Sequence, residues 1–415
     1  MFYREDLLEI WHTINEKVHS EGFERYDYGD ILSHPLYINL LYRPFGRYIG
    51  YFLRVPDILF PIAWRRILGI KKTVFPTAFY HLGMSYLQME AINTKYDSFF
   101  AKEMCRLAYD LKVDAEHLCW GSVYKHHGLQ WSDRNVSKVP PSCAHFGTRL
   151  GTLFLRVGKK HNDSDIIKNG INAAKGLMIY HNINYYEDGS STISYYPYTN
   201  DEVINTSADM AVLLAEIPLD LRTTEMQKHL LGLTKMIVNE QQNEGQWYYC
   251  TKRHYEKLGG EGIIDNHHTA MNLAALAVIW HIGDLSDEIR KDIHKSLIKG
   301  LDYYINHLFN EDGTGFYFPG KRRETEVVGY SEGINAIFEI FHRRVPLPDY
   351  LNIKLKNILP KMLQKAIDKF LIEKTGDVAS MKRFGLKYNI QSIRWGSGPL
   401  LQAITSCLLA VSEEK

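Results

Sequence analysis

Two kinds of helical segment alternate along the chain after residue 72. One kind alternates charged and apolar residues at helical spacing, which is typical of a helix with one face buried and the other in water. Its members are residues 164–181, 225–242, 286–309 and 351–373. The other kind is almost entirely small or apolar after its first turn, which predicts a helix packed on every side. The alternation therefore predicts pairs of one outer and one inner helix.

The inner segments recur at a nearly constant interval. Each follows a Gly-containing turn rich in aromatic residues, then a loop and a cluster of polar residues. Aligning one polar residue from each of four segments gives spacings of 61, 64 and 64 residues. The aligned residues are Asn205, Asn266, Tyr330 and Arg394. Counting back by the same step reaches His145 and then His81, so six repeats fit the chain.

Six two-helix repeats closed into a ring form an all-α fold, the (α/α)6 toroid. We expect this catalytic domain over residues 73–415, preceded by an N-terminal helical extension over residues 1–72. In such a ring the starts of the inner helices converge on one face. The polar clusters, which are far apart in the sequence, are therefore expected to be neighbours in space.

Composition excludes several classes of protein. The 49 basic and 48 acidic residues leave a formal charge of +1, which provides no global field to attract nucleic acid. The five cysteines are an odd number without CxxC spacing, so they predict neither a disulfide framework nor a zinc knuckle. The N-terminus is acidic and helical rather than basic and then apolar, which argues against a secretory signal. We therefore expect a cytoplasmic protein.

One segment of the N-terminal extension has the composition of a helix that lies on a membrane surface. Residues 55–72 read VPDILFPIAWRRILGIKK, and combine apolar residues with Trp64, two arginines and two lysines. The alternative is a helix packed on the main domain whose basic side chains reach outward to water. Both interpretations stay open, and the first predicts peripheral contact with the inner face of a membrane.

The polar clusters at the inner-helix starts are the candidate site. A single Asp or Asn before a helix is usually a cap for the unpaired backbone N–H groups, and Asp265 and Asn266 suit that role. Capping does not require the adjacent His267 and His268. Nor does it explain why every repeat places a different reactive set at the same point: Asp201, Glu202 and Asn205; Tyr330 and Glu332; Arg394 and Trp395; and His145. Convergence of unlike polar groups predicts a ligand cleft.

Aromatic residues in the loops before these helices indicate the class of ligand. They include Tyr196 and Trp247, and the chain has 27 tyrosines. Aromatic rings cover the apolar faces of sugars, and phenol groups hydrogen-bond to sugar hydroxyls. The pattern favours an oligosaccharide or polysaccharide ligand, which includes lipid-linked glycans.

Short motifs add a resemblance. The segment DNHHTAMNLAAL, from residue 265, resembles the Asn-His element that opens an inner helix in toroidal polysaccharide lyases of the alginate lyase type. The segment RRETEVVGYSEGINAIFEI is similar to the part of those enzymes where an arginine precedes the catalytic tyrosine by seven residues, as Arg323 precedes Tyr330. Glucuronyl C5-epimerases share this architecture and tyrosine chemistry. The N-terminal segments YDYGDILSHP and LGIKK resemble proteins encoded with surface-polysaccharide biosynthesis genes.

The resemblance implies removal of the C5 proton of a uronate, with epimerisation or lyase cleavage as the outcome. It makes Tyr330 the base, His267 its partner acid or base, and Asn266 with Arg323 or Arg394 the binders of the carboxylate. The residues expected to line the site beside them are Asp265, Glu202, Asn205, Tyr196, Trp247, Trp395 and His145. No cofactor is implied.

Two alternative functions remain open. Glu332, with Asp201, Glu202 or Asp265, supplies the carboxyl pair that an inverting glycoside hydrolase needs. A glycan-binding protein without catalytic activity would carry the same aromatic lining. A metal site at the histidine pairs 126–127 and 267–268 is not expected, because adjacent side chains on a helix point in different directions.

Overall fold

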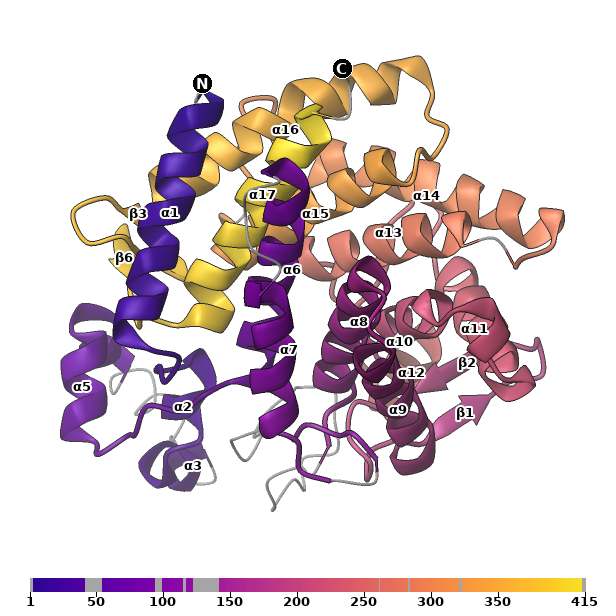
Figure 1. Cartoon of the computed structure of the whole chain (residues 1–415), viewed down its shortest axis with the longest axis horizontal. Coiled ribbons are helices and arrows are strands. Elements are labelled where there is room, and N and C mark those ends of the chain that lie inside the picture. Colours follow the sequence, from indigo (N-terminus) through magenta and orange to yellow (C-terminus); the bar gives the residue numbers. More distant parts are fainter. Residues whose placement is uncertain are drawn as a thin grey trace.

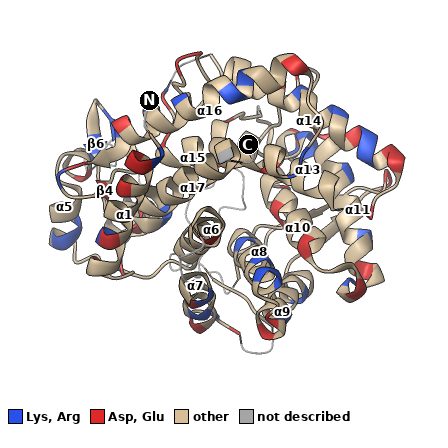
Figure 2. Ribbon diagram, turned by 45° about the horizontal axis from the view of Figure 1, so that its top comes forward, with Lys and Arg blue, Asp and Glu red and all other residues tan. Residues whose placement is uncertain are grey.

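The computed structural model of the 415-residue chain describes residues 3–41, 54–93, 99–114, 117–121, 142–260, 262–282, 284–320 and 323–412. Its main feature is a ring of inner helices wrapped by outer helices (Figures 1 and 2). The inner helices are α6 (Pro76–Ile92), α8 (Ala144–His161), α10 (Ile204–Glu216), α13 (Asn266–His281), α15 (Val327–His342) and α17 (Gly398–Ser412). The outer helices are α1 (Arg4–Glu21), α7 (Phe99–Asp110), α9 (Ser164–Tyr180), α11 (Thr224–Asn239), α14 (Asp287–His307) and α16 (Asp349–Phe370). The predicted (α/α)6 toroid is confirmed.

The inner helices are buried on nearly all sides, as their composition predicts. Beyond its first turn, most side chains of α13 are buried from solvent. Small residues allow the close approach of neighbouring helices. At Gly147 in α8, an added Cβ would meet the side chain of Leu177 in α9 at 2.9 Å, which is closer than real Cβ contacts. The outer helices are more polar on one face, and side chains of Asp163, Thr223 and Ser286 cap α9, α11 and α14.

Helix α1 completes the outer layer, because it packs on α17 and is hydrogen-bonded to α6, the last and first inner helices of the ring (Figure 2). The indole N–H of Trp11 donates a hydrogen bond to Ser85 Oγ in α6 at 2.8 Å. The Tyr86 hydroxyl, also in α6, donates to Asn15 Oδ1 in α1 at 2.6 Å. Residues 4–21 are therefore an outer helix of the ring, and the boundary expected at residue 72 does not separate them from it.

The remaining elements are short. The helices are α2 (Tyr28–Leu32), α3 (Pro35–Leu41), α5 (Pro61–Ile67) and α12 (Lys252–Leu258), with a 3₁₀ turn η1 (Leu219–Leu221) and a π turn η2 (Ile393–Ser397). Three antiparallel hairpins pair β1 (Ile183–Tyr185) with β2 (Ser191–Ile193), β3 (Leu371–Ile372) with β4 (Asp377–Val378), and β5 (Met381–Arg383) with β6 (Leu386–Tyr388). Among the described residues, no helix has both the length and the apolar character needed to cross a membrane.

A buried arginine holds α2 and α5 to the rest of the molecule. Arg65 Nε donates to both oxygens of Asp30 at 3.0 Å, and its Nη1 lies 2.5 Å from Asp57 Oδ1. Its Nη2 donates to the Tyr388 hydroxyl of β6 at 3.1 Å. Of the two neighbouring arginines expected to face outward, only Arg66 is exposed. Arg65 instead joins three parts of the chain.

An ion network crosses the ring near the C-terminal ends of the inner helices. Arg156 of α8 lies 2.9 Å from Glu216 of α10 and 2.5 Å from Glu339 of α15. Arg343 pairs with both of these glutamates, at 3.0 and 3.2 Å. These buried charges tie three inner helices together at this end. The accessible cavity lies at the opposite end, where the inner helices begin.

Candidate active site

A cavity of about 430 Å³ lies where the inner helices begin. Side chains from five inner helices, η2, α2 and the preceding loops line it, including Tyr28, Thr77, Tyr80, His81, His145, Arg149, Tyr195, Asn205, Tyr249, His267, His268, Tyr317, Glu332, Arg394 and Trp395. A smaller cavity of about 50 Å³ shares Tyr80, Arg149 and Glu332 with it and is also lined by Asp209. The volume is typical of a site for a small ligand.

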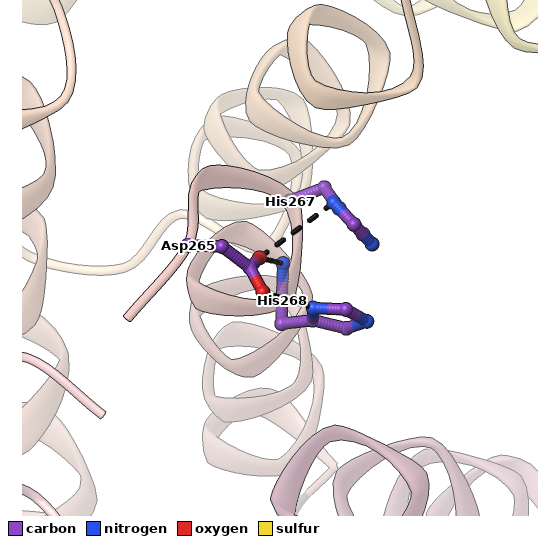
Figure 3. A group of neighbouring side chains, drawn as sticks. All are labelled: Asp265, His267 and His268. Atoms are coloured by element: carbon purple, nitrogen blue, oxygen red, sulfur yellow. Dashed lines mark hydrogen bonds and ion pairs between the residues drawn. The ribbon is translucent and has the colours of Figure 1, made fainter. Parts of the chain in front are cut away.

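Asp265 and His268 form the first paired group of the cavity (Figure 3). Asp265 is the N-cap of α13, and its Oδ1 accepts the backbone N–H of His268 at 3.0 Å. Its Oδ2 lies 2.6 Å from His268 Nδ1. Burial alone would raise the pKa of Asp265, but the two neighbouring imidazoles and the hydrogen bonds lower this pKa to about 2. Asp265 is therefore an ionised carboxylate that orients the imidazole of His268.

His267 lies beside His268 with ring centroids 3.7 Å apart, and its Nδ1 is 3.6 Å from Asp265 Oδ1. Burial and the neighbouring His268 lower its pKa to about 3, so the His267 ring is neutral at physiological pH. Both rings extend to the same side of the helix start (Figure 3). The expectation that adjacent histidines point apart is therefore wrong at 267–268. Both side chains start from the first turn of α13, and no earlier turn of the helix lies between them.

The same three side chains offer donors for a metal ion. One ligand atom from each of Asp265, His267 and His268 lies within 4.8 Å of the others. A carboxylate with two imidazoles is a donor set suited to zinc or a similar transition metal. The other histidine pair considered from the sequence, 126–127, lies outside the described residues.

A second histidine and carboxylate pair faces the cavity from α8 and α10. His145 Nδ1 lies 3.1 Å from Asp209 Oδ2. Arg149, one turn after His145, donates from Nε to the same Asp209 oxygen at 3.1 Å and lies 3.2 Å from Glu332 Oε1 through Nη1. One guanidinium thus joins two carboxyl groups from different inner helices.

These charges separate the pKa values of the two carboxyl groups. Burial raises the pKa of Glu332, and the nearby Asp209 adds to this while Arg149 opposes it. For Asp209, burial acts in the same direction, but Arg149 and His145 outweigh it and leave its pKa below the ordinary value. Burial lowers the pKa of His145, and Asp209 opposes that shift. The cavity therefore holds an ionised Asp209, a neutral His145 and a carboxyl group that binds protons more readily than usual.

Tyrosine rings surround the histidines. Tyr195 stacks on His145 with centroids 6.4 Å apart, and Tyr249 meets His268 edge-on at 4.5 Å. Tyr317 lies edge-on to His267 at 6.0 Å. Burial raises the pKa of all three phenols above the ordinary value, so they stay protonated. They are suited to donate hydrogen bonds and to cover sugar rings, and unsuited to act as bases.

Arg394 brings a positive charge to the cavity wall beside the N-terminal segment. Its guanidinium lies over the ring of Trp395, 4.7 Å from the centroid, and over Phe146 at 5.5 Å. Its Nε is 3.6 Å from Oδ2 of Asp27, the residue that caps α2. Residues 27–33 therefore form one side of the cavity, although they belong to the segment expected to lie outside the catalytic domain.

Most of the polar residues expected to converge do so. The sequence-predicted residues that line the cavity are His145, Tyr196, Asn205, His267, Glu332, Arg394 and Trp395, with Asp265 directly behind the histidines. They come from five repeats that are separated by about 60 residues each along the chain.

Tyr330, the expected base, lies away from the cavity. Its side chain is fully buried between Phe309 and Phe370, and its hydroxyl accepts the backbone N–H of Gly315 at 2.8 Å. Burial raises the pKa of its phenol, with the Gly315 N–H acting against that shift. These contacts give Tyr330 a structural role and argue against its assignment as the base.

The two expected carboxylate binders from the lyase-like motifs also lie elsewhere. Asn266 is fully buried, and its Oδ1 accepts the Tyr304 hydroxyl at 3.0 Å. Arg323 is on the surface, where it pairs with Glu326 at 2.6 Å. Since Tyr330 is displaced as well, the arrangement expected from the resemblance is not assembled.

Two other expected lining residues have structural partners. Glu202 accepts the Thr251 hydroxyl at 2.5 Å and pairs with Arg253 at 3.0 Å, which ties the loop before α12 to α10. Trp247 is buried, and its indole N–H donates to the carbonyl oxygen of Ile237 at 2.8 Å. Neither residue lines the cavity.

Four members of the histidine and ion-pair groups described above were given no role from the sequence: His268, Arg149, Asp209 and Asp27. A signal existed for three of them. His268 follows the N-cap Asp265 by three residues, a position where a side chain can return to the cap. Arg149 and Asp209 follow the aligned residues His145 and Asn205 by four positions, so they lie on the same helix face one turn deeper. Asp27 gave no such signal, because it lies outside the repeats.

A larger groove of about 840 Å³ lies outside the ring, between α11 and the start of α14. Its walls include Leu219, Lys228 and Lys235 but none of the inner-helix residues described above. Among the described residues, no histidine or cysteine lines this groove, so the inner cavity is the stronger candidate for catalysis.

Comparison with known proteins found no matching family model and no matching curated relative. Solved structures do match. A polysaccharide lyase superposes with a TM-score of 0.59 at 11% identity, covering 99% of this chain and 98% of that one. A sugar epimerase from a ruminal bacterium gives 0.59 at 9% identity, over 83% and 90%. An α-1,6-mannanase variant of Salegentibacter sp. HEL1_6, in complex with α-1,6-mannotetrose, gives 0.58 at 10% identity, over 96% and 98%. The fold is thus that of toroidal enzymes, including the lyase class the sequence motifs resemble.

Proposed function

We propose that this chain is a carbohydrate-active enzyme that inverts C5 of a uronate residue in a glycan by proton transfer. The observation that carries the proposal is the presence of two carboxylate-bound imidazoles, Asp265–His268 and Asp209–His145, in one cavity. Epimerisation removes a proton from one face of a carbon and returns one to the other face. Two oriented histidines supply an acid and a base for these two steps.

His268 is the proposed base. An ionised carboxylate accepts hydrogen bonds only, so Asp265 fixes the proton of His268 on Nδ1 and leaves Nε2 with its lone pair. In the first step Nε2 takes the C5 proton, and the C–H electrons move into the adjacent carboxylate to form an enediolate. In the second step His145, after its neutral ring has taken up a proton from solvent, returns that proton to the opposite face of C5. Exchange with solvent then restores both rings.

Arg394 is suited to bind the substrate carboxylate. Its Nε lies 3.6 Å from Oδ2 of Asp27, which is longer than a strong hydrogen bond. Arg149, in contrast, is occupied by Asp209 and Glu332. A cation that binds the substrate carboxylate also stabilises the enediolate, which carries more negative charge. It therefore lowers the barrier to proton removal.

Buried polar atoms without partners support a polyhydroxyl ligand. Among the described residues, Thr77 Oγ1, Asn205 Oδ1 and Trp395 Nε1 have no hydrogen-bond partner, and all three side chains line the cavity. Buried polar atoms are normally hydrogen-bonded, so these donors and acceptors are suited to sugar hydroxyls. The lyase, epimerase and mannanase that share the fold support the same class of ligand. We place the substrate in cytoplasmic surface-polysaccharide metabolism on the N-terminal resemblance.

Hydrolysis is the second candidate, because one pair of carboxyl groups has the required electrostatics. Glu332 has a raised pKa and suits a general acid, while Asp209 has a lowered pKa and suits a base. Arg149 lies between them and contacts both. This pair predicts loss of turnover on Glu332→Gln with no exchange at C5.

The proposal is tested by incubating the protein with uronate-containing glycans in D2O. Wild type is compared with His268→Gln, Glu332→Gln and a control, His12→Gln, whose histidine is exposed on α1. Three signals are followed together: deuterium at C5, absorbance of an unsaturated uronate, and new reducing ends. C5 deuterium that is lost in His268→Gln and kept in His12→Gln supports the proposal.

The other outcomes are distinct. Unsaturated product would show elimination, so the enzyme would be a lyase using the same base. Reducing ends that vanish only in Glu332→Gln would establish the hydrolase and remove His268 from its assigned role. Binding of the glycan by all variants without any of the three signals would identify a binding protein and overturn the proposal.

A further inference from the structure

The helix α5 and the turn before it present apolar side chains to solvent. Leu59 is 50% exposed, Phe60 65% and Ile67 73%, and Ala63 between them is also exposed. Ala63 and Ile67 are spaced by four residues, so they lie along one face of α5, and Leu59 ends the helical segment before it. Val55, 47% exposed, extends the surface into the helical segment at residues 54–59. We name these five residues the α5 patch.

The opposite side of α5 is fixed to the molecule. Arg65 is fully buried in its pairs with Asp30 and Asp57, and the Trp64 indole N–H donates to the Tyr37 hydroxyl at 3.3 Å. Turning α5 to bury its patch would break the Arg65 pairs and leave charges unpaired in the interior, which is strongly unfavourable. The apolar face is therefore held outward.

The charges around the patch have one sign. Arg66, Lys71 and Lys72 are exposed on the same short segment. Between residues 54 and 72, the single acidic residue is Asp57, which is buried against Arg65. Basic residues are visible on α5 at the outer edge of the molecule in Figure 2. The surface thus combines exposed apolar side chains with cations and has no exposed anion within that segment.

We infer that the α5 patch binds the surface of an anionic lipid bilayer. Apolar side chains that enter the boundary between headgroups and acyl chains, together with nearby lysines and arginines, are the features of reversible interfacial binding. A second copy of the chain fits less well, because a two-fold contact through this patch would bring Arg66, Lys71 and Lys72 close to the same cations. The inference does not depend on the proposed function.

Membrane contact here would also place the cavity near the lipid. Arg65 joins α5 to Asp30 in α2, and α2 supplies Tyr28 and Gly29 to the cavity wall. If the proposed function holds, a glycan attached to a lipid headgroup therefore reaches the cavity across a short part of the molecule.

The experiment is sedimentation of the full chain with vesicles. One set contains phosphatidylcholine alone and the other equal parts of phosphatidylcholine and phosphatidylserine. The variants are Ile67→Gln and Arg66→Glu, and the matched control is Ile179→Gln on α9, where Ile179 is 59% exposed. Wild type and Ile179→Gln are expected to sediment with the anionic vesicles only. Each patch variant is expected to bind them about tenfold more weakly.

Two results would overturn the inference. The first is wild-type protein that stays in solution with both vesicle types, or loses binding equally in Ile179→Gln and Ile67→Gln. The second is a mass twice that of one chain by light scattering, reduced to one chain by Ile67→Gln, without vesicle binding; the patch would then be a dimer interface. Thermal unfolding of each variant verifies that the substitutions leave the fold intact.

Discussion

Asp265 holds His268 through two atoms at once: its Oδ1 accepts the His268 backbone N–H at 3.0 Å, and its Oδ2 lies 2.6 Å from the imidazole Nδ1. The same carboxylate thus caps α13 and fixes the orientation of the ring that follows. One residue therefore caps a helix and orients the proposed base. Suitable substitutions can separate these two roles.

Asp265→Asn keeps the capping oxygen, because Asn and Asp cap helices equally well. It removes the charge that holds the proton of His268 on Nδ1. We expect kcat to fall about 100-fold or more, as for loss of an oriented base, with a thermal midpoint close to that of wild type. His268→Gln is expected to lose a similar factor. A full loss of stability in Asp265→Asn with unchanged kcat in the folded fraction would show that Asp265 is only a cap.

Tyr330→Phe is expected to lower stability and leave kcat unchanged. The Tyr330 hydroxyl accepts the buried N–H of Gly315, and a buried N–H without a partner costs about 1–3 kcal/mol. Urea unfolding measures the loss, with Tyr350→Phe on the exposed face of α16 as the control. A kcat reduced 100-fold at unchanged stability would restore Tyr330 as the base.

Added Zn²⁺ is expected to inhibit turnover. Asp265, His267 and His268 bring three donor atoms within 4.8 Å of one another, and a metal there would occupy the proposed base. A chelator should restore activity. His267→Gln removes one donor and should reduce the sensitivity to Zn²⁺. Activity that instead requires a metal, and is abolished by the chelator, would assign these residues as ligands of a metal enzyme.

Stability is expected to fall in acid because of buried neutral histidines. Burial lowers the pKa of His181 to about 4, and its ring lies between Ser142 Oγ and the Ser194 carbonyl oxygen. In the unfolded chain a histidine has a pKa of about 6.5. The unfolded state therefore takes up a proton first, so the stability from this group is complete above pH 6.5 and is lost as the pH falls toward 4.

His181→Gln removes this proton-binding difference. Between about pH 7.5 and about pH 5, wild type should lose about 2 kcal/mol more unfolding free energy than the variant. Urea unfolding at the two pH values gives both numbers. Burial also lowers the pKa values of His81 and His267 to about 3, so the unfolding free energy of both proteins depends on pH. The quantity to compare is the difference between the pH slopes of the two proteins. Equal slopes would show that His181 is protonated in the native state.

Arg65→Met is expected to detach the N-terminal wall of the cavity. It leaves the carboxylates of Asp30 and Asp57 buried without a cation, which costs about 3–5 kcal/mol. Limited proteolysis should cut the chain between α1 and α6, and substrate affinity should fall because Asp27 and Tyr28 line the cavity. Arg66→Met, at the exposed neighbour, is the control and should change stability by less than about 0.5 kcal/mol. Equal effects of the two substitutions would contradict the anchoring role.

The ring itself was predictable because its cause is local. A helix that is buried on every side must be largely apolar all round, and that composition is visible in inner segments such as α13 and α17, although α8 departs from it with Arg149 and Arg156. The place of α1 was not predictable in this way. Its contacts, such as Trp11 with Ser85, join residues 74 positions apart, and an amphipathic N-terminal helix has the same pattern whether it is an outer helix or an extension.

For the site, spacing predicted where polar residues gather but not which way they point. Tyr330 and Glu332 are two residues apart, which is about 200° around a helix, and only Glu332 reaches the cavity. Aligning the repeats on Tyr330 selected the wrong face of α15. Side-chain direction depends on how each helix is rotated by its neighbours, and a single sequence does not contain that rotation.

The position of α1 also has a consequence for biosynthesis. Helix α1 contacts both α6 and α17, and α17 is synthesised after the other helices of the ring. The nascent chain therefore carries Trp11 and the apolar sides of α6 without α17 until residues 398–412 have been translated. Closure of the ring by α17 is a late, long-range step. Chains that stop before residue 398 leave the surfaces that α17 covers exposed, and these surfaces are prone to aggregation.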